Sequence, residues 1–396
     1  MRIIALINQK GGCGKTTTAV NLSACLAHHG KKVLLIDLDP QGHASLALGV
    51  SPEEISFRMA SVLSQEAAIE EILIKGPYPG LDLAPSNLRL AALEQQLSGL
   101  PQREERLLES LRRLPWSYDL IVIDAPPSLG LLSFNALRVA DEVIVPVDAS
   151  AFSLHGLNRL LDTLDLLQER TGQTIDVSAL ATLSSKTRFA QEVVEILDKR
   201  FAEDDVKRLH GGRLRTVIRS NTHLREATRS GVPIVHYDPH AIAAHDYEAL
   251  AQEILQRERE ALLPVQGAAQ EALPGFSPLA GGALFTWIGP EDVAIAGEFN
   301  DWIPDRKIYS IPGEREGENV QKWLPFAAPR SAYRLRIDGV WREDPYNPRR
   351  VEHPIGGSSS VLELSDSVAL SLPEKQPSHA SVVAWKAPMS KTGSLD

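Results

Sequence analysis

Cysteine is scarce in this sequence: only Cys13 and Cys25 occur among 396 residues. So small a number excludes the disulfide-rich scaffolds of secreted proteins and fits a reducing compartment. Long apolar runs are missing as well. No stretch of about 18 apolar residues could span a bilayer, and no basic segment followed by an apolar one opens the chain. The sequence therefore predicts a cytoplasmic protein with neither a signal peptide nor a membrane span.

Positive charge is also scarce. The chain has 41 lysines and arginines but 51 aspartates and glutamates, so its net charge is −10. This balance excludes a protein that binds nucleic acid over most of its surface, so any such contact must come from a local basic patch. The length and the hydrophobic content of 43% are sufficient for a substantial core and for more than one domain.

What the chain does contain is a glycine-rich stretch near the N-terminus, where residues 10–18 read KGGCGKTTT. An apolar run at 3–7 precedes it, and apolar residues at helical spacing follow over 19–29. The order strand, glycine-rich turn and helix is the context that a phosphate-binding loop requires. Glycines let the backbone approach an anion without a Cβ clash, and the helix N-terminus points backbone N–H groups toward the phosphates. We therefore expect this stretch to bind a nucleotide.

Carboxylates end two further apolar strands. Residues 33–36 lead into DLDPQG at 37–42, and a later apolar run leads into Asp124, which APP follows. In doubly wound folds the C-terminal ends of parallel strands face the crevice where ligands bind. We expect Asp124 to hold Mg²⁺ through a water, together with the hydroxyl of Thr16, while Lys15 reaches the β- and γ-phosphates.

These motifs occur in order with a fourth, VIRSNTHLREA at 217–227, and together they resemble the deviant Walker A motif and switch segments of the ParA/MinD family, of the ParA/Soj type. The resemblance spans residues 1–257. It implies ATP and Mg²⁺ as cofactors and a homodimer that forms with ATP. In that family the first lysine of the loop, here Lys10, touches the phosphates held by the partner. The second aspartate of switch I, here Asp39, helps to place the attacking water.

The expected site residues fall into three groups. The catalytic residues are Lys10, Lys15 and Asp39. Thr16 and Asp124 are expected to hold the metal, with Asp37 close to it. Nucleotide contacts are expected from Lys10, Gly11, Gly12, Cys13, Gly14, Lys15, Thr16 and Thr17, and from Asn221 near the adenine. The implied reaction is hydrolysis of ATP to ADP and phosphate, slow and stimulated by a partner.

Basic residues gather between 207 and 229, where Glu226 is the one acid that interrupts them. The resemblance implies that arginines here contact DNA phosphates without reading sequence, and the candidates are Arg213, Arg215, Arg219, Arg225 and Arg229. Arg219 and Ser220 replace the proline and the arginine usual in this segment, and a merely solvated basic surface is the alternative.

The expected partners are non-specific DNA and a ParB-like or other cargo adaptor, which would place the protein on the nucleoid in the cytoplasm. A MinD-type protein would end in a basic amphipathic helix that inserts into the membrane. Because residues after 257 do not have that pattern, we expect no membrane insertion.

The order of elements predicts the fold class. Alternation of strands and helices over about 250 residues favours an α/β doubly wound parallel sheet, the P-loop ATPase domain at 1–257. Alanine, glycine, glutamine and proline recur over 258–280, which we expect to be a linker. Short strands separated by glycine, Asn-Asp and proline turns predict a small all-β sandwich at 281–365. The polar residues 366–396 are predicted to be a disordered tail.

The sandwich region contains AGEFNDW at 296–302 and YRLRIDGVW at 333–341. It resembles the immunoglobulin-like glycogen-binding module of AMP-activated kinase β subunits. That resemblance implies a carbohydrate site for an α-glucan, made by Trp302, Arg334, Trp341 and Ser359, with the serine standing where that family has an asparagine. The alternatives are that the tryptophans support the fold or bind a protein partner.

The sequence thus predicts an ATP-dependent dimerising ATPase that binds DNA non-specifically and partitions or positions a chromosome, plasmid or other cargo, with a C-terminal carbohydrate- or partner-binding module. The alternative is an ATP-switched adaptor that positions a polyglucose granule or a protein assembly with negligible hydrolysis.

Overall fold

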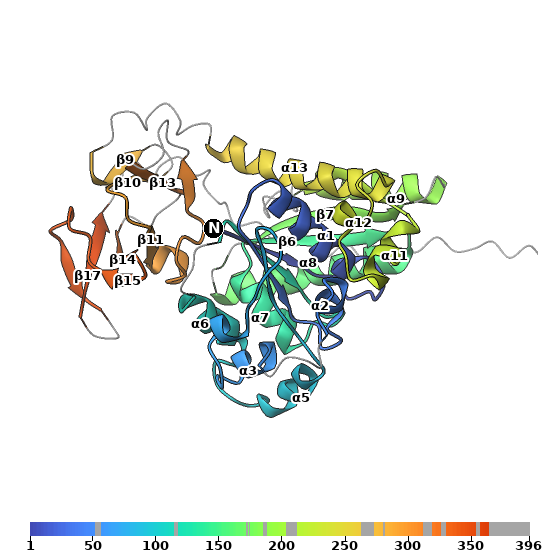
Figure 1. Cartoon of the computed structure of the whole chain (residues 1–396), viewed down its shortest axis with the longest axis horizontal. Coiled ribbons are helices and arrows are strands. Elements are labelled where there is room, and N and C mark those ends of the chain that lie inside the picture. The colour runs from blue at the N-terminus through green and yellow to red at the C-terminus, as the bar shows by residue number, and fades with distance from the viewer. Residues whose placement is uncertain are drawn as a thin grey trace, which may run out of the picture.

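An eight-stranded sheet forms the N-terminal part of the molecule, with strand order β3-β4-β2-β5-β1-β6-β7-β8 (Figure 1). Neighbouring strands are parallel except for β3 and β4. The strands are β1 (Arg2–Leu6), β2 (Val33–Asp37), β3 (Ile74–Tyr78), β4 (Leu81–Ala84), β5 (Leu120–Asp124), β6 (Glu142–Asp148), β7 (Asp176–Ser184) and β8 (Gly212–Arg219). The predicted α/β class with a doubly wound sheet is confirmed.

The structure is a computed structural model. It describes residues 1–51, 57–114, 118–171, 173, 175–184, 188–202, 212–262, 273–279, 282–311, 319–325, 330–353 and 357–363. Among these residues, no helix is long and apolar enough to cross a membrane. The tail predicted at 366–396 lies outside the described residues.

Helices cover both faces of the sheet. They are α1 (Lys15–His28), α2 (His43–Ala47), α3 (Met59–Leu63), α4 (Ile69–Ile72), α5 (Arg89–Gln96), α6 (Arg106–Arg112), α7 (Leu131–Val139), α8 (Ala151–Thr171), α9 (Arg188–Ala202), α11 (His223–Arg229), α12 (Ile234–Tyr237) and α13 (Ile242–Leu262), with a short 3₁₀ turn, η1, at Arg103–Glu105. Alternate strand residues serve two cores. Ile3 packs with α3 and α5–α9, and Ile4 packs with α1, α2 and α11–α13. Burial on both faces explains why β1, β2 and β5 read as almost continuous apolar runs.

The parallel strands give the sheet two distinct edges. We call the edge where β1, β2, β5 and β6 end the carboxyl edge, and the edge where they begin the amino edge. Leu6, Asp37, Asp124 and Asp148 are the last residues of these strands. The carboxyl edge therefore collects three carboxylates, in the place where ligands bind in this class of fold.

Two antiparallel sheets form the C-terminal part. One has the order β12-β13-β10-β9, and the other β11-β14-β17-β16, with β15 paired to β14. The strands are β9 (Gly275–Leu279), β10 (Gly282–Ile288), β11 (Val293–Gly297), β12 (Tyr309–Ile311), β13 (Asn319–Pro325), β14 (Arg330–Ile337), β15 (Val340–Arg342), β16 (Arg350–Glu352) and β17 (Ser358–Glu363), and a 3₁₀ turn, η3, lies at Glu298–Asn300. Phe285 and Leu324 of one sheet pack with Ile295, Tyr333 and Leu335 of the other.

The range 258–280, expected to be a linker, is partly structured. Helix α13 continues to Leu262, and Glu258 on it pairs with Lys31 at 3.1 Å. Strand β9 occupies 275–279 because Phe276 packs against Phe285 and Tyr333, with ring centroids 5.0 Å apart in each pair. Composition alone suggested a flexible segment, but these tertiary contacts order both of its ends.

The sandwich packs against the amino edge through residues 301–308, which we call the docking segment. Ile303 is fully buried and belongs to the hydrophobic core of the N-terminal part. The Lys307 N–H donates to the carbonyl of Met1 at 2.9 Å, and Arg306 Nε donates to the Asp141 carboxylate at 2.8 Å. In Figure 1 the N-terminus accordingly lies between the sheet and the sandwich.

Candidate functional site

The loop between β1 and α1 forms an open cradle at the carboxyl edge. Gly12 and Gly14 adopt left-handed backbone, with φ of 77° and 93°, which β-carbons disfavour. A Cβ at Gly12 would meet no atom within 4 Å, so the space beside the loop is open. The Thr182 hydroxyl of β7 donates to the Cys13 carbonyl at 2.7 Å and fixes the loop to the sheet. Such a cradle has the shape and the N–H donors that suit a phosphate.

Lys15 begins α1 and points back along this loop. Its side chain is buried and its Nζ donates to the carbonyl of Lys10 at 3.0 Å. The Cys13 thiol lies beside the same carbonyl, at 3.2 Å. Burial raises the pKa of Cys13, so this thiol stays protonated and behaves as a small side chain rather than as a reactive thiolate.

Two buried aspartates face each other across neighbouring strands, because Asp37 ends β2 directly beside Asp124 at the end of β5. Asp37 accepts hydrogen bonds from the N–H and the hydroxyl of Ser45, at 2.9 and 2.8 Å. Neither carboxylate oxygen of Asp124 has a hydrogen-bond partner among the described residues. Burial, reinforced by Asp37, raises the pKa of Asp124, although the nearby Thr16 hydroxyl and Lys15 ammonium oppose the rise, and burial raises the pKa of Asp37 to about 7. A buried acid without partners is costly unless a cation compensates it, so the pair fits Mg²⁺.

Asp39 lies two residues beyond Asp37 and is nearly buried. Its N–H donates to Asp37 at 3.1 Å, and its own carboxylate accepts the N–H of Gln41 at 2.9 Å. The Ser86 hydroxyl, from the segment after β4, donates to the Asp39 carbonyl at 2.7 Å. These contacts hold a second carboxylate at the carboxyl edge, and its negative charge contributes to the raised pKa of Asp124.

The other lysine of the loop, Lys10, is held within its own chain. Its Nζ pairs with the carboxylate of Asp148 and donates to the hydroxyl of Ser150 at 2.8 Å. Asn8 supports this arrangement, since its side chain accepts the Lys10 N–H at 3.1 Å and donates to the Pro146 carbonyl at 2.7 Å. The sequence analysis missed Asp148, although it ends a parallel strand as Asp37 and Asp124 do.

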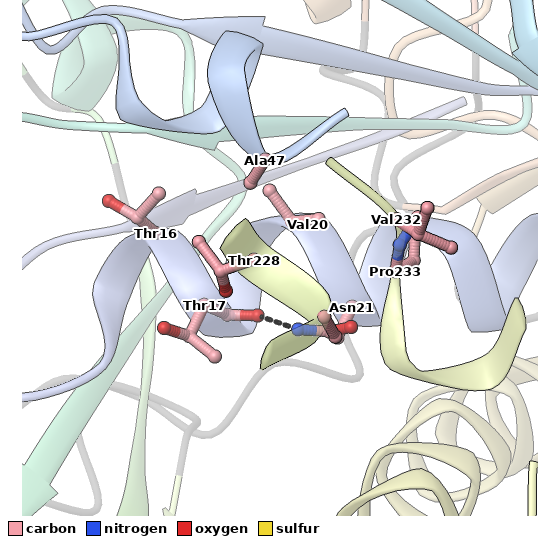
Figure 2. Close-up of a pocket in the computed structure, with 9 residues that line it drawn as sticks. Thr16, Thr17, Val20, Asn21, Ala47, Thr228, Val232 and Pro233 are labelled. Carbon is pink, nitrogen blue, oxygen red and sulfur yellow. Dashed lines mark hydrogen bonds between the residues drawn. The ribbon is translucent and has the colours of Figure 1, made fainter. Parts of the chain in front are cut away.

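A small cavity lies beside the loop, between α1, α2 and the segment that follows α11 (Figure 2). Its volume of about 20 Å³ suits roughly one water and is too small for a nucleotide. Asn21 borders it, donating to the Thr17 carbonyl at 2.7 Å and accepting the Ile234 N–H at 2.7 Å. Asn21 therefore fastens the helix that begins at the loop to α12, next to the basic segment.

The arginines of the basic segment divide into two sets. Arg219 is paired with Asp246 through two 3.1 Å contacts, and Arg213 is paired with Asp198. The remaining candidates are exposed and have no acidic partner among the described residues; they are Arg215, Arg225 and Arg229. Residues 203–211, the basic ones at 207 and 208 included, lie outside the described residues. Asn221 accepts the His223 N–H at 2.8 Å where α11 begins.

The tryptophan expected in the sandwich site lies beside a residue that the sequence analysis missed. The Trp302 and His353 rings meet edge to face, with centroids 4.7 Å apart. Arg334 donates weakly to the Trp341 carbonyl at 3.5 Å, whereas its Nε is buried without a partner among the described residues. The Ser359 hydroxyl is likewise buried and unpartnered there. Burial and the nearby Arg334 lower the pKa of His353, and Ser359 pairs with Val351 two residues before His353, so both residues lie close to the aromatic pair.

Comparisons with known proteins identify relatives of the N-terminal part of the chain. The AAA domain family matches residues 1–177. Soj, the sporulation initiation inhibitor protein of Bacillus subtilis, is 40% identical over 255 residues, which cover 64% of this chain and 98% of Soj. The chain belongs to the ParA/Soj family.

Other members and structures extend this ParA/Soj relationship. The chromosome partitioning protein ParA of Myxococcus xanthus is 36% identical over 259 residues, covering 65% of this chain and 89% of that protein. Cobyrinic acid a,c-diamide synthase from Mycobacterium smegmatis, solved with an ATP analogue and magnesium, matches with a TM-score of 0.55 at 29% identity, over 66% of this chain and 97% of that one. A second structure of that protein holds ADP and magnesium. The ParA/Soj relationship concerns about the first 260 residues.

Proposed function

We propose that this ParA/Soj-family protein is an ATPase that dimerises with ATP, binds DNA without sequence preference and partitions or positions a cargo. The observation that carries the proposal is the buried Asp124, which has no hydrogen-bond partner within the described part of the chain and lies near the open glycine cradle and Lys15. A cation-binding carboxylate next to a phosphate-binding loop is the arrangement that phosphoryl transfer needs, because its catalysis depends on positioning and charge neutralisation.

Each side chain has a role in this proposal. Lys15 binds the β- and γ-phosphates, and Asp39 orients the attacking water. Thr16 and Asp124 hold Mg²⁺, which neutralises phosphate charge when it is bound. Backbone N–H groups of residues 10–17 surround the phosphates, and Asn221 lies near the adenine.

Lys10 is proposed to be the dimerisation switch. Asp148 and Ser150 hold it within the chain, so it must leave them to reach a partner's phosphates. Size-exclusion chromatography with MgATP tests this role. Lys15→Ala should lose ATP binding, whereas Lys10→Ala should bind ATP and remain a monomer. Lys32→Ala, at an exposed lysine, is the control, and equal dimer in wild type and Lys10→Ala would reject the role of Lys10.

Hydrolysis separates this proposal from an ATP-switched adaptor. Asp39→Ala should accumulate the ATP-bound dimer and release phosphate at least about tenfold more slowly, because water placement contributes on the order of 10²-fold or more. The adaptor interpretation predicts negligible phosphate release by the wild type, even with DNA and a ParB-like or other cargo adaptor present.

DNA binding is assigned first to Arg225 and Arg229 on α11, whose charges are exposed and unpaired among the described residues. Dimerisation doubles this patch, so that two weak contacts act together. We therefore propose that the ATP-bound dimer resides on the nucleoid and that a ParB-like or other adaptor links it to its cargo.

For the sandwich we propose a second function, binding of an α-glucan. It is supported by the buried atoms of Arg334 and Ser359 that have no partner among the described residues, close to Trp302 and His353. Sugar hydroxyls can accept a hydrogen bond from a buried donor and donate one to a buried acceptor, and the C–H faces of sugars pack on aromatic rings. Maltoheptaose should change the tryptophan fluorescence of the full chain, and Trp302→Ala should remove that change. Val340→Ala, at an exposed side chain on β15, is the control. No response, together with a protein partner retained only when Trp302 is present, would favour a partner-binding module.

A further inference from the structure

The docking segment has an unusual backbone. Seven non-glycine residues have a left-handed φ in the described part of the chain, and four of them lie between 301 and 307. They are Asp301, Trp302, Asp305 and Lys307, with φ of 55°, 62°, 57° and 57°. Residues with a β-carbon rarely adopt this conformation. It persists only where the surroundings hold it, and such strain concentrates at ligand clamps and switch regions.

One end of this strained segment lies at the proposed ligand face. The Trp302 ring contacts His353, close to Arg334 and Ser359, which have buried polar atoms without a partner among the residues that the structure describes. Trp302 is also tied to its own strand end, because its N–H donates to the Gly297 carbonyl at 2.9 Å. A ligand that packs on this ring therefore restrains the backbone of residues 301 and 302.

The neighbouring residue, Asp301, contacts the ATPase part directly. Its carboxylate binds Arg306 at 2.6 Å and lies 3.6 Å from Arg138 on α7. Its carbonyl accepts Arg112 Nε of α6 at 2.6 Å. Arg306 in turn is 1% exposed and binds Asp141, so the half-buried Asp301 belongs to a network of ion pairs that spans both parts of the molecule.

Two elements lead from this network to the carboxyl edge. Helix α7, which carries Arg138, begins at Leu131, seven residues after Asp124. Strand β6 begins directly after Asp141 and ends at Asp148, the residue that holds Lys10. Helix α7 and strand β6 thus connect the docking segment with the carboxyl edge through continuous secondary structure.

We propose that ligand binding at the Trp302 face and nucleotide binding at the carboxyl edge are energetically coupled through Asp301. The proposal rests on the proposed function, in which that face takes a ligand. The coupling is positive. A ligand that restrains Trp302 and Asp301 also orders the Arg138 end of α7, so the chain loses less conformational entropy when the nucleotide then binds. Linkage requires that each ligand raise the affinity for the other by the same factor.

Equilibrium binding to the full chain measures this factor. Saturating maltoheptaose should raise the affinity for a non-hydrolysable ATP analogue with Mg²⁺ about fivefold or more, and the analogue should raise the maltoheptaose affinity equally. Asp301→Asn should reduce the factor to near one, because the amide removes the charge that Arg138 and Arg306 neutralise. Asparagine tolerates left-handed backbone, so the fold is retained.

The matched control is Asp338→Asn. Asp338 has φ of 49° in the β14–β15 turn and accepts the Asp292 N–H at 3.0 Å within the sandwich. This variant should keep the wild-type factor. A wild-type factor of one, with maltoheptaose bound, would overturn the coupling while leaving the glycan site intact.

If maltoheptaose does not bind, the glycan site is rejected. Amide hydrogen exchange then tests whether the docking segment is coupled to the nucleotide site. The ATP analogue alone should then slow exchange over residues 297–308 in the wild type and not in Asp301→Asn. Identical wild-type exchange with and without the analogue would overturn the coupling itself.

Discussion

The two edges of the ATPase sheet differ in whether their buried charged side chains have partners. At the amino edge each buried charge of the docking segment has a partner: Arg306 binds Asp141 at 2.8 Å, and Asp305 binds Lys322 at 2.5 Å. At the carboxyl edge Asp124 is buried without a hydrogen-bond partner among the described residues and faces a second acid.

This difference distinguishes a structural contact from a ligand site. A buried ion pair adds little net stability, but removing one member leaves an uncompensated charge. A buried acid without a partner destabilises the protein until a cation binds. We therefore expect the same kind of substitution to have opposite effects on stability at the two edges.

The largest effect is expected from breaking the pair at the amino edge. Arg306→Ala removes the buried 2.8 Å partner of Asp141 and leaves only Lys307, at 3.9 Å, to balance its charge, which should lower the free energy of unfolding by about 3–5 kcal/mol. Urea denaturation measures the loss. Arg342→Ala, at an exposed arginine of β15, is the control and should change stability by less than about 0.5 kcal/mol. A loss below about 1 kcal/mol at Arg306 would contradict the comparison.

A smaller effect of the opposite sign is expected at the carboxyl edge. Asp124→Asn removes one of two facing acids, so the nucleotide-free protein should become more stable, by about 1 kcal/mol. The same variant should lose the rise in melting temperature that Mg²⁺ with ATP analogue produces in the wild type. Thermal denaturation with and without ligand reports both results, and a less stable nucleotide-free variant would argue against an unsatisfied acid pair.

The acid pair also predicts a pH dependence. Burial and the neighbouring Asp37 raise the pKa of Asp124 well above its ordinary value of 3.8, so between 3.8 and the raised pKa the folded chain holds a proton that the unfolded chain has released. The contribution of this group to the free energy of unfolding therefore falls as the pH rises through that window. The stability advantage of Asp124→Asn over wild type should thus be larger at pH 8 than at pH 5. An advantage independent of pH would exclude the coupled burial of these acids.

The smallest effect extends the comparison to the basic segment. Arg225 is unpaired among the described residues, whereas Arg219 is paired with Asp246. Arg225→Ala should reduce the slope of log affinity for duplex DNA against log salt by about 1, since one phosphate contact is lost. Arg219→Ala should change the slope less, because its charge is already neutralised. Equal effects of both variants would show that the ion pair opens on DNA.

Local pattern was sufficient for much of the fold. The apolar runs before residues 8, 38 and 125 predicted β1, β2 and β5, because strands buried on both faces need continuous apolar residues. The glycines at 12 and 14 predicted the loop, since only they accept its left-handed backbone without strain. In the structure the parallel pairing of β2 and β5 places Asp37 beside Asp124.

No local sequence pattern predicted the contacts between residues that are far apart in the chain. Lys10 and Asp148 lie 138 residues apart, and Arg306 and Asp141 lie 165 apart. Ile303 reads as an ordinary turn residue, yet it completes the core of the ATPase part.

The sequence by itself therefore determined the α/β sheet, the phosphate loop and the residues that meet at its carboxyl edge, because neighbours along the chain set strand, turn and helix. Only the tertiary structure decided where Lys10 is held, which arginines remain unpaired and how the sandwich docks. Those outcomes depend on which charged and apolar side chains come into contact when the chain folds. Burial increases the free-energy gain of a well-matched contact and the free-energy cost of an unmatched one.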